Sequence, residues 1–123
     1  MNDLESNTLN KTLDAIDAVI AEKKTAVKRG EMLERLMIDQ DFKEVILDSY
    51  IEEEAARLFQ ILIDPSGASP YTSDQIQRKL DSIRDFKGHV ETIKMNAKRA
   101  PEEILREEVY RKEATAKFAR DGE

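Results

Sequence analysis

The chain has 123 residues, of which 37% are charged, and it carries a net charge of −6 with no cysteine. This length suits one domain. The lack of cysteine excludes disulfides, thiolate nucleophiles and cysteine-ligated metals, and the acidic balance argues against general coating of nucleic acid. No apolar run approaches the roughly 18 residues of a membrane span, so we expect no membrane partner. We predict a single helical domain over 1–123, with frayed ends at 1–8 and 119–123.

The first predicted helix carries a heptad stripe. Its apolar residues recur at spacings of three, four and seven, which indicates a seam that packs against another helix. The stripe consists of Leu9, Leu13, Ile16, Ile20 and Val27. Two interpretations stay open: the helix packs on its own core, or it forms a coiled-coil arm that joins copies through Leu13, Ile16 and Ile20. Gly30 is expected to break or bend this helix.

Two adjacent segments differ sharply in charge. Residues 41–64 carry seven acidic and two basic side chains, whereas residues 65–100 carry seven basic and four acidic ones. Both segments have helical apolar spacing, and a loop with two prolines and a glycine joins them. Helices of opposite charge on a short connection predict an antiparallel helical hairpin of 42–63 with 73–99. The expected fold class is therefore all-α.

Local signals set the expected ends of the hairpin helices. Asp41 is the expected cap of a helix that begins at Phe42. Pro65 ends that helix, because the residue before a proline avoids helical dihedrals. Thr72 and Gln75 match a capping box at the start of the second helix. The hairpin prediction therefore rests on residues at both sides of the loop.

The last predicted helix begins at Pro101, a residue that suits the first turn of a helix. Its apolar stripe is thin and breaks after Tyr110. We therefore expect a C-terminal helix that projects from the body, frays, or is ordered by a neighbour. Its candidate contacts are Val109, Tyr110 and Phe118.

The candidates for chemistry are weak. The only histidine, His89, follows Asp85 by four residues, which is a common surface pair on helices. Glutamates 52–54 could suggest a metal site, but three consecutive residues spread over about 200° of a helix. We interpret them as an acidic patch for solvent or a partner, formed by Asp48, Glu52, Glu53 and Glu54. We predict no catalytic, cofactor-binding or metal residue, and no small-molecule substrate.

A basic stripe is the remaining candidate surface. Lys94 and Lys98 share a helix face, and Arg99 is adjacent to them. Such a stripe could bind phosphates in a manner that depends on salt and not on sequence. Acidic residues interspersed after position 101 weaken that interpretation. Nucleic-acid binding is therefore considered but not favoured.

Five stretches carry a resemblance to a known group of proteins. They are Ala26–Glu31, Leu33–Leu36, Asp41–Lys43, Tyr50–Leu58 and Ile76–Ile93. Together they resemble small, acidic, all-helical proteins encoded by tailed bacteriophages, in regions of head, packaging or other virion genes. The resemblance covers residues 26–95 and contains no catalytic motif. It implies a role in the virion or its assembly, and it transfers no functional residues.

Three function hypotheses follow. The leading one is a non-enzymatic phage structural or assembly protein, a virion or procapsid component that acts through helix–helix contacts. Its partners would be copies of itself or other phage structural proteins, in the virion or in the host cytoplasm during assembly. The second is a nucleic-acid-associated packaging factor similar to a small terminase subunit. The third is a small regulator that binds a host protein through the acidic patch.

Overall fold

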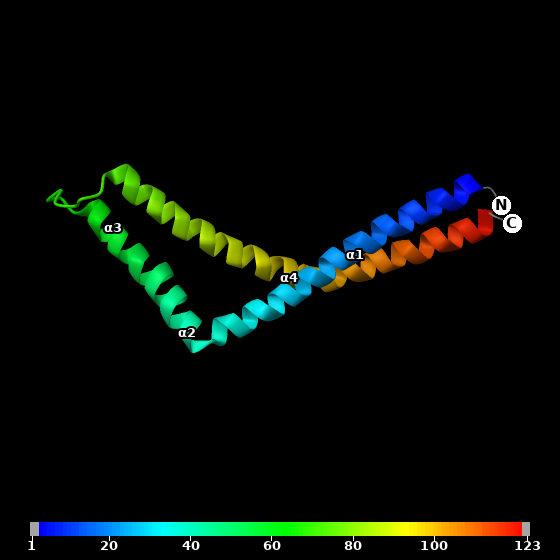
Figure 1. Ribbon diagram of the computed structural model, residues 1–123, viewed down its shortest axis with the longest axis horizontal. Coiled ribbons are helices and arrows are strands. Elements are labelled where there is room, and N and C mark those ends of the chain that lie inside the picture. The colour runs from blue at the N-terminus through cyan, green and yellow to red at the C-terminus, as the bar shows by residue number, and fades with distance from the viewer. Residues whose placement is uncertain (1–2, 122–123) are drawn as a thin grey trace. The chain divides into compact units, whose positions relative to one another are not determined.

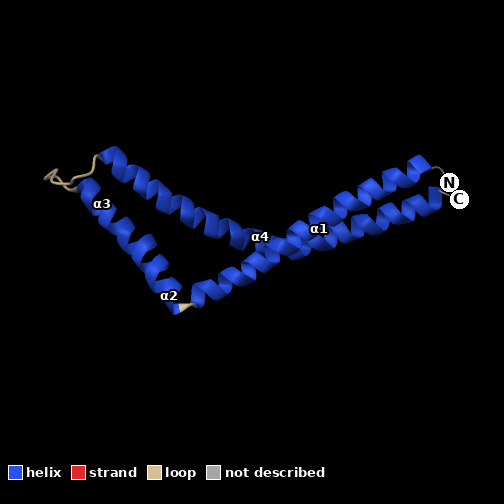
Figure 2. Ribbon diagram, viewed as in Figure 1, coloured by secondary structure: helices blue, strands red, loops and turns tan. Residues whose placement is uncertain are grey.

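Residues 3–121 are helical, apart from a break at residue 39 and the loop of residues 64–72 (Figures 1 and 2). The computed structural model describes residues 3–121. In chain order its elements are α1 (Asp3–Ile38), α2 (Gln40–Phe42), η1 (Lys43–Glu54), α3 (Ala55–Ile63) and α4 (Ser73–Asp121). No strand occurs in residues 3–121, which confirms the all-α class. None of the helices in this range is long and apolar enough to cross a membrane.

The expected single domain contains two compact units. The first combines Met1–Glu31 with Lys94–Glu123, and the second comprises Met32–Ile93. Residues 3–8 and 119–121, which we expected to fray, belong to α1 and α4. The other residues of those two terminal segments lie outside the described range. The first unit brings together two segments far apart in the sequence, whereas the second is one continuous segment.

The first unit is an antiparallel pair of helices. The beginning of α1 and the end of α4 lie at the same end of this pair (Figure 1). Asp17 contacts Arg111, Lys23 contacts Glu103, and a side chain at position 30 would meet residue 97. As the residue number rises along α1, the number of the contacted residue falls along α4, so the two helices run in opposite directions. The heptad stripe of α1 therefore packs against the C-terminal half of α4 in the same chain.

Gly30 does not break α1, contrary to our expectation. The helix continues through it to Ile38, and Gly30 is buried. A Cβ built at this position would overlap the Cβ of Ala97, which lies on α4. The glycine is therefore explained by the close approach of two helices, since only a residue without a side chain fits there.

One expectation about the C-terminal segment was wrong. No new helix begins at Pro101, because α4 runs through this proline as one helix of 49 residues. The segment is ordered against a neighbouring helix, one of the three states expected for it, because it packs on α1 of the same chain. A proline inside a helix costs about 3 kcal/mol through its lost hydrogen bond and its ring. Residues on both sides of the proline contact their surroundings: Ala100 is fully buried, and Glu103 pairs with Lys23 of α1.

The second unit is a helical hairpin with a small apolar core. Leu58 of α3 packs with Ile76 and Ile83 of α4. The rings of Tyr50 and Phe86 lie edge to face, with their centres 6.1 Å apart. Half-buried side chains surround this core: Ile51, Ala55, Ile61, Leu62 and Leu80. The predicted hairpin is thus confirmed for 42–63 with the first part of α4. Residues 94–99 belong to the first unit instead.

The first arm of the hairpin departs from the predicted regular helix in its middle. The helix is capped by Asp39, whose carboxylate accepts a hydrogen bond from the Phe42 N–H at 2.9 Å. The predicted cap at Asp41 was therefore wrong by two positions, because Asp39 holds the extended backbone that a cap requires. Residues 43–54 then form a π-helix, η1. Its wider turn aligns residues four or five apart, which places Ile46, Leu47 and Ile51 on the half-buried side.

The hairpin loop follows the predicted local signals. α3 ends at Ile63, and the Asp64 carboxylate accepts hydrogen bonds from the backbone N–H and hydroxyl of Ser66. These bonds lower the pKa of Asp64. Thr72 and Gln75 form the predicted capping box, in which each side chain binds the backbone N–H of the other. The loop is thereby fixed at both ends.

Candidate interaction surfaces

The three heptad residues proposed as an interface lie on the seam of the first unit. Leu13 and Ile16 are half-buried, and Ile20 is buried. The same chain covers them, because the seam faces α4. Their role in joining copies stays a prediction. Substituting Leu13 and Ile20 would also disturb the fold of the first unit, so tests of association need other positions.

Two ion pairs flank the seam. Lys23 Nζ lies 2.6 Å from Glu103 Oε2, and Arg111 Nε donates to Asp17 Oδ1 at 3.0 Å. The bond to Glu103 raises the pKa of Lys23, and the bond from Lys23 lowers the pKa of Glu103. Pairs that are partly open to solvent, such as these two, contribute modest stability. Their geometry matters more here, because they fix the register of the two helices.

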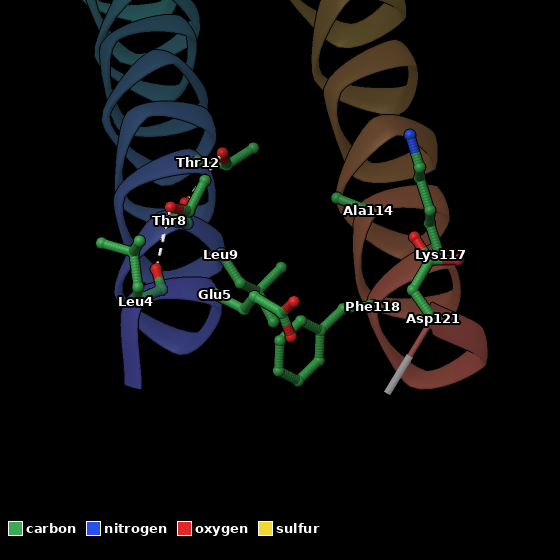
Figure 3. Close-up of a pocket in the computed structure, with 9 residues that line it drawn as sticks. All are labelled: Leu4, Glu5, Thr8, Leu9, Thr12, Ala114, Lys117, Phe118 and Asp121. Carbon is green, nitrogen blue, oxygen red and sulfur yellow. Dashed lines mark hydrogen bonds between the residues drawn. The ribbon is translucent and has the colours of Figure 1, made fainter. Parts of the chain in front are cut away.

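A groove opens between the two helices at the end where the termini lie (Figure 3). The side chains of Glu5, Leu9 and Phe118 point into the space between α1 and α4, with Ala114 above them. Phe118, a predicted contact, is half-buried here. The groove is lined by Leu4, Glu5, Thr8, Leu9, Thr12, Ala114, Lys117, Phe118 and Asp121. We call this surface the terminal groove.

Apolar side chains also lie on the outside of α4. Leu105 is 63% exposed and Val109 is 50% exposed. They are four residues apart and therefore share a helix face, which we call the outer face. Tyr110 is 48% exposed, but it lies about 100° further round the helix. The structure thus separates Tyr110 from Val109, two predicted contacts that adjoin in sequence.

Sequence reasoning missed two parts of these surfaces. Leu4 was assigned to a frayed end, yet it lines the terminal groove. Leu105 was not among the predicted contacts of the last helix, yet it is more exposed than Val109. The four-residue spacing of Leu105 and Val109 was the available signal, but it does not say which side faces the core.

The predicted acidic patch is only partly assembled. Asp48 and Glu53 line one shallow surface of the hairpin together with Glu44. Glu54 instead forms a bidentate pair with Arg57, at 2.6 and 2.9 Å, and this pair lowers the pKa of Glu54. Glu52 is exposed and does not line that surface. Residues 3–121 contain no group of three acidic or histidine side chains placed to hold a metal ion.

The predicted basic residues all lie on the surface of α4. Lys94, Lys98 and Arg99 are exposed, with Lys94 and Lys98 one turn apart. His89 and Asp85 are also exposed. The side chains that could carry chemistry are therefore spread along helix surfaces and do not converge.

Comparison with known proteins gives no match. No protein-family model, curated protein or solved structure matches this chain.

Proposed function

We propose that the protein is a non-enzymatic assembly protein that joins copies of itself through helix–helix contacts. The observation that carries this proposal is the outer face of α4. Leu105 and Val109 are each at least half exposed, although the same helix packs another stripe against α1. Contiguous exposed apolar side chains are typical of interaction surfaces.

The small core of each unit supports the same proposal. Among residues 3–121, the buried apolar side chains are Ile20, Leu33, Leu58, Ile76, Ile83 and Ala100. Two-helix units with so few buried side chains gain stability when neighbours cover their apolar surfaces. The resemblance to phage virion proteins suggests where this assembly would take place: in a phage particle or its precursor.

Absolute mass by light scattering after size exclusion tests the proposal. We expect an oligomer at both low and high salt, because apolar contacts are not screened. Changing Leu105 and Val109 together to Gln should weaken association roughly tenfold or more, since each buried aliphatic side chain contributes about 1.5–3 kcal/mol.

The matched control changes Lys24 and Lys28 to Gln, because these two exposed residues are also four residues apart but lie on α1, away from the outer face of α4. It should leave the mass unchanged, and circular dichroism should show equal helicity in all variants. A monomeric wild-type protein over a wide concentration range would overturn the proposal.

Nucleic-acid binding is the second candidate, and the exposed stripe of Lys94, Lys98 and Arg99 favours it. It predicts DNA binding that falls steeply with salt and is lost when these three residues are changed to Gln. Binding that does not depend on the three residues would remove this candidate.

A further inference from the structure

We propose that the terminal groove of one copy binds the terminal groove of a second copy, in a twofold-symmetric contact. This inference rests on the proposed function and names one contact of the assembly. In such a contact residue i of one copy meets residue j of the other, and j meets i in return. The surface must therefore be complementary to itself.

The apolar content of the groove is the first reason. Leu9 and Phe118 approach the open space between the helices from opposite sides (Figure 3). Both are half-buried, and Leu4 at the edge of the groove is exposed. Among the residues that the structure describes, only those of α1 and α4 line the groove. A second copy would cover these side chains, and burial of apolar area contributes about 25 cal/mol per Å².

The charges of the groove indicate which occupant fits. Glu5 and Asp121 are acidic and Lys117 is basic, and all three line the same groove. A partner of uniform charge would meet a like charge somewhere in it. A second copy turned by the twofold axis can set its Lys117 against Glu5, and its Glu5 against Lys117. Glu5 and Lys117 are therefore complementary in charge to the same two residues of a second copy, and Asp121 leaves the groove with one further acidic group.

Local complementarity is needed in this chain for a further reason. Each copy carries a net charge of −6, so two copies repel each other at long range. Opposite charges across the contact reduce this repulsion and fix the register of the two grooves. The apolar side chains supply the affinity, while Glu5 and Lys117 select the partner.

Two charge reversals test this contact. In Glu5→Lys both positions of the groove are basic, and in Lys117→Glu both are acidic. When two copies of the same variant meet, like charges face each other at two places, because position 5 of each copy faces position 117 of the other. Association should therefore weaken roughly tenfold or more for each variant alone.

An equimolar mixture of the two variants makes the test specific. Across a mixed contact, the lysine introduced in the Glu5→Lys chain would face the glutamate introduced in the Lys117→Glu chain. The unchanged Lys117 of the first chain would face the unchanged Glu5 of the second. Both contacts are then favourable between chains, although the charges within each chain remain alike. The mixture should recover the wild-type mass.

Light scattering and sedimentation velocity measure the outcome on the full chain. Lys28→Glu is the matched control, because this exposed lysine of α1 lies outside the groove. It should associate as the wild type does. The inference is overturned if either single reversal associates like the wild type, or if the mixture stays dissociated. In those cases an oligomeric wild type would still support the proposed function, whereas a monomeric wild type would overturn both.

Discussion

Gly30 offers the sharpest test of the helix pairing. A methyl group at this position would overlap the Cβ of Ala97. Overpacking of this kind costs roughly 1–3 kcal/mol, whereas Ala improves helix propensity over Gly by about 1 kcal/mol. The clash between the two Cβ atoms should outweigh the gain in helix propensity, so Gly30→Ala should lower the free energy of unfolding by up to about 2 kcal/mol. Urea unfolding followed by circular dichroism measures this change.

Gly88 provides the matched control. It also lies within a helix, α4, but a Cβ built there meets no atom within 4 Å. Gly88→Ala should therefore stabilise the protein by about 0.5–1 kcal/mol. The exchange Gly30→Ala with Ala97→Gly moves the methyl group to the other helix, and it should restore most of the stability. If Gly30→Ala stabilises as much as Gly88→Ala does, the helices do not approach closely at this point.

Two further predictions concern the core and the pH dependence. Leu58→Ala should lower the stability of the fold by about 2–5 kcal/mol, because Leu58 is fully buried. Phe59→Ala should change it by less than about 0.5 kcal/mol, because Phe59 is exposed. Thermal unfolding of the two variants compares these effects. The pKa of Glu103 lies below its ordinary value of 4.5, and the pKa of Lys23 lies above its ordinary value of 10.5. Between pH 4.5 and pH 10.5 the pair therefore makes its full contribution to the stability of the fold. This stability is lost as the pH falls through the lowered pKa of Glu103, or rises through the raised pKa of Lys23. Glu103→Gln should make the acid limb of the stability profile shallower, and an unchanged limb would contradict the assignment.

The hairpin was predictable because its signals are local. The Thr72–Gln75 box and the proline at position 65 act on their own neighbours, so the sequence alone places the ends of the loop. The π-helix was not predictable in this way. Its apolar residues are compatible with an ordinary helix as well, and no single residue type dictates the wider turn. The cap at Asp39 was missed because Asp41 offers the same chemistry two residues later.

The pairing of α1 with α4 was missed for a different reason. A heptad stripe indicates that a helix has a partner, but it does not identify that partner. The stripe on α4 was hard to see because Pro101 looks like a helix start and Arg111 occupies a seam position. Yet apolar residues recur at intervals of seven or fourteen on both sides of that proline. They are Ile83, Val90, Ala97, Ile104 and Phe118.

Polar residues on the seam complete the explanation. Arg111 reaches sideways to Asp17, and Lys23 reaches Glu103. Long charged side chains can bury their stems and keep their heads in solvent. The seam therefore accommodates Arg111 and Lys23 with little loss of stability. A search of the sequence for apolar residues at heptad spacing does not anticipate such charged positions.

Spin–spin distances test the pairing of α1 with α4 most directly. The chain has no cysteine, so labels can be placed at chosen exposed sites, with unlabelled chains added in excess to suppress distances between copies. Labels at Asp14 and Lys112 should give a short, narrow distance. Labels at Asp14 and Lys98 should give a distance larger by up to about 20 Å, because 14 residues of helix separate the two sites on α4. A shorter distance for the second pair, or broad distances for both, would contradict the antiparallel pairing.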